Sequence, residues 1–305
     1  MDQVTSHVLM IRPLAFGFNA ETAENNVFQH KPTAIEGSIV SNQALQEFDD
    51  FVRLLENEGI QVTVIQDTLN PAKPDAVFPN NWISFHQDGT VITYPMYSKL
   101  RREERREDIV QKLSGSFDLK QRIHLEDFEL HNQFLEGTGS MVLDRVHKIA
   151  YACISERTDL DLLNEWCAKM NYIPHTFHGV SNGQPIYHTN VMMAIASKVA
   201  IVCLDCLPDQ DERSSLSDTL SFHHHVVEIS DTQVQSFAGN MLALKNKSGE
   251  ELMVMSARAL ESLSAQQRAE IEKYCRIVAS PIPTIEDVGG GSARCMIAEV
   301  FLDPK

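Results

Sequence analysis

The chain has 305 residues, of which 43% are hydrophobic, and its formal net charge at pH 7 is −16. This composition supplies a substantial core, and the acidic surface argues against binding to nucleic acid or anionic membrane, which depends on clustered Lys and Arg. No apolar run approaches the roughly 18 residues of a membrane span. The opening MDQVTSHVLMIRP lacks the pattern of a secretory signal. We therefore expect a cytoplasmic protein.

Short apolar, β-rich runs recur along the chain in pairs that are joined by turn residues, a pattern typical of β-hairpins. The pairs are 82–96, 140–155, 191–206 and 241–256, and a fifth pair is divided between 7–14 and 295–302. Their first strands begin at 82, 140, 191, 241 and 295, at steps of 58, 51, 50 and 54 residues. A nearly fixed period indicates a repeat architecture, and pairing of the two chain ends would close the repeats into a ring.

Helix-like segments lie between the hairpins. They are 42–59, 99–113, 158–170 and 264–275. We interpret the basic stretch KLRREERRED at 99–108 as a solvated helix face, because acids are interleaved at helical spacing. Five hairpin-plus-helix units predict a single α/β domain over 1–305, a five-bladed α/β propeller. A doubly wound sheet also alternates strands and helices, but hairpins argue against purely parallel crossovers.

A C-x-x-C motif is a further candidate site. Cys203 and Cys206 form a C-x-x-C that is followed by His223, His224 and His225, but the spacing is not that of a zinc site. We interpret the cysteines as a strand end and an exposed turn, and expect no metal.

The chain has neither a G-x-G-x-x-G nor a P-loop motif, so no cofactor is expected. The Asn-rich segment 16–30 fits a mobile lid and a plain surface loop equally well.

A short polar segment precedes the first strand of every hairpin. These segments are FPNN (78–81), LEGTG (135–139), YHTN (187–190), FAGN (237–240) and GGGSARC (289–295). In a closed ring, equivalent positions converge on the axis, so these segments should line one cavity. The expected cavity residues are Asn81, Glu136, His188, Asn190, Asn240 and Cys295. Each residue alone has an ordinary structural explanation, but their agreement in phase favours a site in which the glycines shape the loop that carries Cys295.

At these residues the sequence resembles the guanidine-modifying (amidinotransferase or pentein) superfamily, which includes arginine deiminases, dimethylarginine dimethylaminohydrolases and amidinotransferases. The order Glu136, His188, Cys295 matches the superfamily, PDAVFPNN (74–81) looks like its P-D-S-V-F-V-E-D stretch, and SERT (155–158) matches its S-x-R-T. The resemblance spans essentially the whole chain and implies a five-bladed α/β propeller. The nearest subgroup is the bacterial citrulline-utilisation hydrolases.

The resemblance implies a role for each site residue. Cys295 is the nucleophile, helped to ionise by a cationic substrate or by protonated His188, and His188 moves protons. Glu136 holds substrate N–H groups and steadies His188. The remaining substrate-binding candidates are Arg157 for the carboxylate, Asp75 for the α-amino group or a substrate nitrogen, and Arg101, Asn80, Asn81, Asn190 and Asn240. No cofactor is implied. Homo-oligomers are common in the superfamily, although nothing in the sequence identifies an interface.

Two amides separate this chain from its relatives. Arginine deiminases have Asp at the positions of Asn81 and Asn190, and the dimethylaminohydrolases have Glu-Asp in place of Asn80 and Asn81. An amide can donate to the carbonyl oxygen of a neutral ureido group, whereas a carboxylate cannot. We therefore favour a ureidohydrolase that converts citrulline to ornithine. The alternatives are an arginine deiminase or dihydrolase, a dimethylarginine dimethylaminohydrolase, an amidinotransferase and a non-catalytic pentein binding module.

Overall fold

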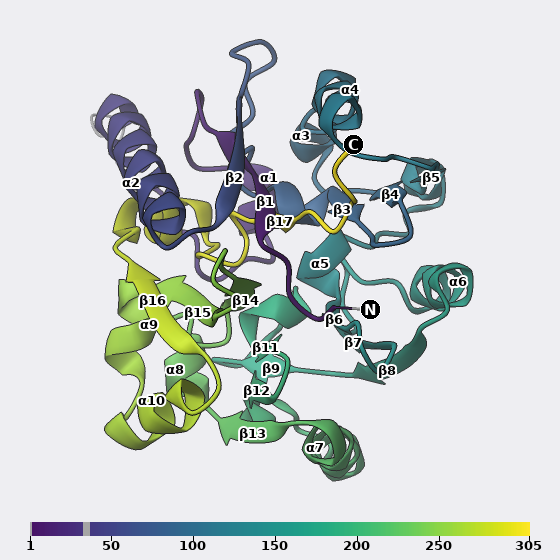
Figure 1. The fold of residues 1–305 in the computed structure, drawn as a ribbon, viewed down its shortest axis with the longest axis vertical. Coiled ribbons are helices and arrows are strands. Elements are labelled where there is room, and N and C mark those ends of the chain that lie inside the picture. Colours follow the sequence, from purple (N-terminus) through teal and green to yellow (C-terminus); the bar gives the residue numbers. More distant parts are fainter. Residues whose placement is uncertain (1, 33–36) are drawn as a thin grey trace.

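The computed structural model describes residues 2–32 and 37–305 and has a mixed α/β fold. Within these ranges, no helix has the length and apolar character needed to cross a membrane. Small sheets surround the middle of the molecule, and the longer helices lie on its outside (Figure 1).

Five three-stranded sheets share one topology. In each, two antiparallel strands are followed by a third strand parallel to the second. The sheets are β3 (Ile83–Phe85), β4 (Thr90–Thr93) and β5 (Gln121–His124); β6 (Val142–Asp144), β7 (Ile149–Cys153) and β8 (Ile173–Phe177); β11 (Met193–Ile195), β12 (Val199–Val202) and β13 (His225–Glu228); β14 (Leu242–Lys245), β15 (Glu251–Ser256) and β16 (Arg276–Ser280); and β17 (Ala298–Glu299), β1 (His7–Arg12) and β2 (Gln61–Gln66). A separate two-stranded hairpin pairs β9 (Val180–Ser181) with β10 (Gln184–Pro185).

The fifth sheet joins the two ends of the chain. Val8 is paired with Glu299 in antiparallel register, as the divided pair of apolar runs predicts. All five expected hairpins are therefore present. The third strand of each sheet was not predicted, because most residues of these strands are exposed or only half-buried. In β8, for example, Ile173 is 66% exposed, so no clear apolar alternation marks the strand.

The helices vary in length and position. The longer ones are α2 (Gly37–Asn57), α4 (Glu107–Ser116), α6 (Leu160–Met170), α7 (Gln210–His223), α9 (Ala257–Ser262) and α10 (Ala265–Glu272). The short ones are α1 (Ala20–Ala23), α3 (Lys99–Arg102), α5 (Gly137–Ser140) and α8 (Asp231–Val234). Single 3₁₀ turns cover Pro79–Asn81, Glu126–His131, Thr189–Val191 and Leu204–Cys206, and a π turn covers Ile285–Gly289.

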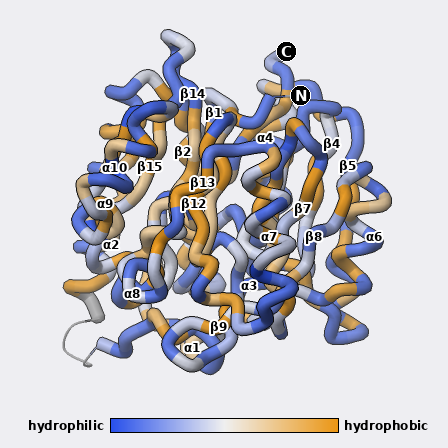
Figure 2. The backbone as a smooth tube through the Cα atoms, turned by 90° about the horizontal axis from the view of Figure 1, so that it is seen from below, coloured by the Kyte–Doolittle hydropathy of each residue, from blue (hydrophilic) through white to orange (hydrophobic). Residues whose placement is uncertain are grey.

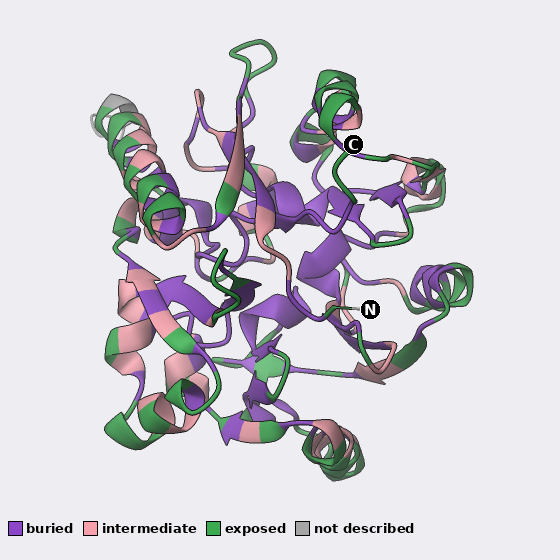
Figure 3. Ribbon diagram, viewed as in Figure 1, coloured by how far each residue is buried: buried purple, intermediate pink, exposed green. Residues whose placement is uncertain are grey.

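The helices cover the sheets with one apolar face each. In α2, the side chains of Phe48, Phe51 and Leu55 are fully buried, and Gly59 adopts the left-handed conformation typical of a helix end. Apolar and polar residues alternate along the outer helices (Figure 2), and the exposed residues lie on their outward sides (Figure 3). Helix α7 was not predicted, because only Leu216 and Leu220 of its residues are buried and its apolar stripe is narrow.

The basic stretch 99–108 differs from the solvated helix face that the sequence predicted. The expected single helix is divided into α3 and α4, and Arg101 and Glu104 are only 3% exposed each. Glu104 turns inward to bind the Arg101 guanidinium through two bonds of 2.9 and 3.0 Å. A buried bidentate ion pair therefore interrupts what the charge pattern indicated as a solvated face.

The polar segments before the hairpins come together at one end of the sheets. The turn Pro79–Asn81 packs against α5, and α5 packs against the turn Thr189–Val191. The spacing of the repeats predicted this convergence. The convergence brings together the side chains of the candidate active site.

Candidate active site

A small cavity lies where the polar segments meet. Its walls carry six of the predicted residues, which are Asp75, Asn81, Arg101, Arg157, His188 and Cys295. The space open to the centre of a water-sized sphere is about 20 Å³, which is enough for roughly one water molecule. A free amino acid is larger, so its entry requires part of the wall to move.

Two amide groups surround the sulfur of Cys295. The Nδ2 atoms of Asn240 and Asn190 lie 3.2 and 3.7 Å from Sγ. The Asn240 amide is fixed, because its Oδ1 accepts from the backbone N–H of Arg294 at 3.1 Å and its Nδ2 also donates to the carbonyl of Asn190. Both amides therefore present N–H groups to the sulfur, where they would stabilise a thiolate.

His188 and Glu136 form a buried pair. Nε2 of His188 lies 2.8 Å from Oε2 of Glu136, and the backbone N–H of Tyr97 donates to Oε1 at 2.8 Å. Burial raises the pKa of Glu136, but the Arg157 guanidinium and the His188 bond outweigh it and hold the pKa at about 2. Burial also lowers the pKa of His188 to about 4, although the bond to Glu136 opposes this shift.

These pKa values define the resting state of the pair. An ionised carboxylate only accepts hydrogen bonds, so Nε2 of His188 carries the proton, and Nδ1 keeps its lone pair. The neutral imidazole is a base in the resting site. The expected help from a protonated His188 in ionising Cys295 is therefore not supported. Glu136 is also not part of the cavity wall, and its oxygens are used by Tyr97 and His188. Its contact with His188 orients the imidazole ring, and Nη1 of Arg157 lies 3.7 Å from the same carboxylate oxygen.

Arg101 determines the orientation of Asn81. Nη1 of Arg101 donates to Oδ1 of Asn81 at 2.8 Å, and Nη2 also donates to the Phe78 carbonyl at 3.1 Å. Because a guanidinium cannot accept a hydrogen bond, the Asn81 oxygen must face Arg101. The Nδ2 atom of Asn81 is therefore a buried donor, and it has no partner among the residues that the structure describes. Glu104, which fixes Arg101, was not recognised as a site residue because it lies inside a charged run.

Further buried polar atoms have no partner among the described residues, in Asp75 of the cavity wall, in Asn80 next to Asn81, and in Asn190 next to Cys295. They are Oδ1 of Asp75, Oδ1 and Nδ2 of Asn80, and Oδ1 of Asn190. Unsatisfied buried groups are rare in native proteins, and a cluster of them indicates a polar ligand. Burial raises the pKa of Asp75 although Arg101 opposes this shift, and its other oxygen accepts from Nδ2 of Asn19 at 2.8 Å.

The segment 16–30 covers the cavity. Thr22 and Asn26 belong to its wall. Arg157 donates to the Thr22 carbonyl at 2.9 Å through Nη2 and to Oδ1 of Asn25 at 2.9 Å through Nε. The segment thus occupies the position of a lid, and substrate could reach Arg157 only by replacing these contacts. Sequence reasoning missed Thr22, Asn25 and Asn26, which lie outside the repeated segments.

The glycine loop meets the same segment. Gly290 has a positive φ of 64°, and a Cβ there would overlap the side chains of Gln29 and Asn26. Asn26 donates to the Gly290 carbonyl at 3.1 Å, and the Tyr187 hydroxyl donates to the same carbonyl at 2.9 Å. The glycines therefore allow the loop that precedes Cys295 to pass directly beneath the covering segment.

The C-x-x-C motif is separate from this cavity. Cys203 and Cys206 are both buried, with their sulfur atoms 3.0 Å apart, so the expected exposed turn is wrong for Cys206. The motif follows β12 and folds into a 3₁₀ turn, in which only Asp205 faces outward. Of the three histidines, His224 contacts Asp144 rather than either cysteine, so the conceivable Cys–His zinc site is not formed.

Comparison with solved structures shows a shared fold. The chain resembles ArgZ, an arginine dihydrolase from the ornithine-ammonia cycle in cyanobacteria, with 15% identity and a TM-score of 0.74 over 96% of this chain and 40% of that chain. It resembles a cysteine-to-alanine mutant of AgrE in complex with L-arginine, with 15% identity and a TM-score of 0.76 over 96% of this chain and 40% of that chain. A mutant dimethylarginine dimethylaminohydrolase, in an adduct with S-methyl-L-thiocitrulline, matches with 14% identity and a TM-score of 0.65 over 96% of this chain and 98% of that chain.

These likenesses differ in how much of each relative they cover. The chain spans 40% of full-length ArgZ but 97% of structures of the ArgZ N-terminal domain alone. No curated protein matches the chain in sequence comparison. The family model described as N,N dimethylarginine dimethylhydrolase, eukaryotic, matches residues 12–302. The chain therefore belongs to this family, within the guanidine-modifying pentein superfamily.

Proposed function

We propose that this protein is a cysteine-dependent hydrolase of C–N bonds in the guanidino or ureido group of an arginine- or citrulline-like amino acid. The favoured reaction is hydrolysis of citrulline to ornithine, ammonia and carbon dioxide. We further propose that the five sheets are the blades of a closed five-bladed α/β propeller and that residues 1–305 form one catalytic domain.

The observation that carries the ureido preference is the free Nδ2 donor of Asn81. Its orientation is fixed by Arg101, and this buried N–H has no partner among the described residues, so we assign it to an acceptor on the substrate. A ureido group has a carbonyl acceptor at its central carbon, whereas a guanidinium has only donors. The ureido carbonyl therefore satisfies Asn81, and a guanidinium would leave its N–H unpaired.

The proposed chemistry uses groups that already lie at the cavity. Nδ1 of His188 takes the thiol proton of Cys295 while Sγ attacks the ureido carbon. The protonated His188 then transfers that proton to the departing nitrogen, and ammonia leaves a thiocarbamate on the sulfur. His188 next deprotonates a water, which displaces the sulfur, and the resulting carbamate breaks down to ornithine and carbon dioxide. Glu136 holds the imidazole in position and stabilises its cation.

Substrate binding requires the covering segment to open. We assign the substrate carboxylate to Arg157, whose N–H groups would exchange Asn25 and Thr22 for it, and the α-amino group to the free oxygen of Asp75. This accounts for a cavity that is too small for an amino acid in the closed state.

A second candidate is an arginine dihydrolase, which the likeness to ArgZ and AgrE favours. It would use the same groups twice, since two hydrolytic steps convert arginine to ornithine with the release of two molecules of ammonia. The uncharged Asn81 and Asn190 then serve the ureido intermediate of the second step.

The test is a product assay on the purified protein, with arginine and citrulline offered separately and Cys295→Ser in parallel. Ornithine and ammonia from citrulline alone support the ureidohydrolase, and ornithine from both substrates supports the dihydrolase. Accumulation of citrulline from arginine identifies a deiminase and contradicts the amide argument. Transfer of the labelled amidino group to an acceptor amine identifies a transferase. A binding module would give no product and no selective modification of Cys295 by a haloacetamidine.

A further inference from the structure

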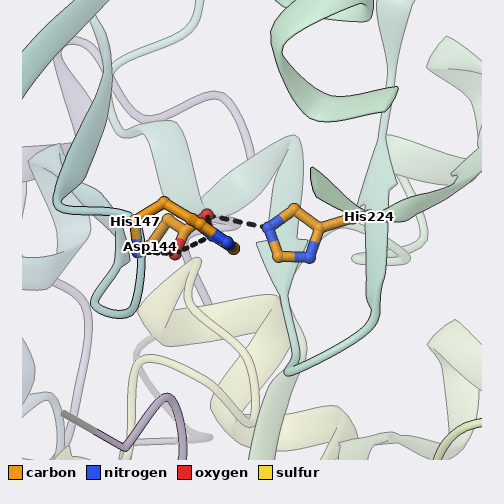
Figure 4. A group of neighbouring side chains, drawn as sticks. All are labelled: Asp144, His147 and His224. Carbon is orange, nitrogen blue, oxygen red and sulfur yellow. Dashed lines mark hydrogen bonds and ion pairs between the residues drawn. The ribbon is translucent and has the colours of Figure 1, made fainter. Parts of the chain in front are cut away.

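A second cluster of ionisable side chains lies outside the cavity. Asp144 ends β6, His147 lies in the turn between β6 and β7, and His224 directly precedes β13 (Figure 4). One ligand atom from each lies within 4.8 Å of the others. The cluster therefore joins the hairpin turn of one sheet to the third strand of the next, and it shares no residue with the cavity wall.

Both imidazole rings face the same carboxylate. Nε2 of His224 and Nδ1 of His147 each lie 2.8 Å from Oδ2 of Asp144 (Figure 4). The side chains of Asp144 and His224 are almost completely buried, whereas that of His147 is 32% exposed. The exposed edge of His147 opens the cluster to solvent on one side, where an ion could enter.

Asp144 is a buried carboxylate that is held by the two imidazoles. In the described part of the chain, its only ion-pair partners are His147 and His224. Buried charges in proteins are paired or coordinate a metal ion, so a carboxylate in this position is suited to a metal ligand.

We propose that Asp144, His147 and His224 bind a divalent transition metal of the zinc class, through Oδ2, Nδ1 and Nε2 respectively. Two imidazoles and one carboxylate form a ligand set that suits Zn²⁺ and leaves a fourth position for water. The metal supplies a cation to the buried carboxylate. It also connects two neighbouring sheets, so its role is structural and independent of the proposed hydrolysis.

The geometry requires only a small adjustment. Tetrahedral ligands at about 2.0–2.2 Å from zinc lie roughly 3.4 Å apart, compared with the 2.8 Å contacts described above. His147 lies in a hairpin turn next to Val146, which is 51% exposed, so this ligand can move outward. Binding also moves the His224 proton to Nδ1, which has no partner among the described residues, and the metal must offset that cost.

The test is titration of the purified, metal-free protein with Co²⁺, followed by competition with Zn²⁺. The variants are His147→Ala and His224→Ala, and the matched control is His131→Ala, because His131 is an exposed histidine outside the cluster. We expect wild type and His131→Ala to bind one equivalent more than either cluster variant. The visible absorption of this equivalent should lack the near-ultraviolet bands of cobalt–thiolate bonds, which excludes Cys295 and the C-x-x-C motif as its ligands.

Two further readouts separate metal binding from simple destabilisation. Zn²⁺ should raise the unfolding temperature of wild type and His131→Ala but not that of His147→Ala, because only a protein with the complete ligand set is stabilised by binding. His147→Ala should keep the wild-type far-ultraviolet circular dichroism, which shows that it folds. The proposal is overturned if all four proteins bind the same number of cobalt ions, or if every bound cobalt shows thiolate bands.

Discussion

Oδ1 of Asn81 accepts a hydrogen bond from Nη1 of Arg101 at 2.8 Å, and this contact leaves the Nδ2 group of Asn81 as a hydrogen-bond donor. Arg101 is itself fixed by Glu104, so a rotated amide would place its NH₂ group against a guanidinium that cannot accept a hydrogen bond. Burial raises the pKa of Glu104 to about 7, although Arg101 opposes this shift. Glu104, which the sequence analysis interpreted as part of a solvated helix face, thus fixes Arg101 and through it the orientation of the Asn81 amide.

The first prediction concerns this amide. Replacement of Asn81 and Asn190 by Asp removes both Nδ2 donors and adds negative charge beside the reacting group. We expect kcat/KM for citrulline to fall by about 10- to 100-fold, the equivalent of one or two lost hydrogen bonds, and the preference to move toward arginine. Steady-state assays on both substrates measure this change. The control is Asn132→Asp, which adds the same charge at an exposed asparagine outside the cavity wall and leaves both donors. An unchanged preference in the double variant would contradict the ureido argument.

The second prediction concerns the positioning of His188. Glu136→Gln keeps the size of the side chain but removes the charge that stabilises a protonated imidazole. We expect kcat to fall by roughly 10²- to 10⁴-fold, the usual contribution of a positioned acid or base, while KM changes little because Glu136 is not in the cavity wall. A variant with a raised KM and a normal kcat would show instead that Glu136 binds substrate directly.

A third prediction follows from the pKa of His188. The proposed base must be neutral, and its pKa in the folded protein is about 4 rather than the ordinary 6.5. The acid limb of the kcat/KM profile should therefore lie near pH 4, and activity should be retained at pH 5.5. An acid limb at pH 6.5 would mean that the imidazole is accessible to water in the free enzyme and that its burial has been overstated.

The pKa values of His188 and Glu136 also predict how the free energy of unfolding depends on pH. The folded pKa of His188 is depressed, so its contribution is present above pH 6.5 and is lost as pH falls toward 4. The folded pKa of Glu136 is depressed from 4.5 to about 2, so its contribution is present above pH 4.5 and is lost as pH falls toward 2. The free energy of unfolding should therefore decrease on acidification below pH 6.5. Urea titrations of wild type and His188→Asn between pH 4 and 7.5 should give a shallower decrease in the variant.

The sequence predicted more of the site than of the surrounding fold. Cys295, His188 and Asn81 line the cavity because they occupy equivalent places in the repeated hairpins, and a period can be read from apolar runs alone. Asp75, Arg101 and Arg157 were expected only from the family resemblance. Whether Glu136 faces substrate or His188 could not be read in this way, since it depends on side-chain direction. The third strands and α7 were missed for a different reason, because they bury few side chains and carry only a weak periodic signal.

The last prediction tests how closely the first two hairpin segments approach each other. Gly139 lies close to the side chains of Asn81 and His188. A Cβ added at Gly139 would overlap Nδ2 of Asn81 and would lie 2.8 Å from Nδ1 of His188. Gly139→Ala should therefore displace the amide donor and the base together, and reduce kcat/KM by at least about 10-fold, since overpacking forces such side chains from their positions. Gly115→Ala is the matched control, because a Cβ in that helix meets no atom within 4 Å and should leave activity unchanged. Wild-type activity in Gly139→Ala would mean that Asn81 and His188 can separate without loss, and that their close packing has no part in the reaction.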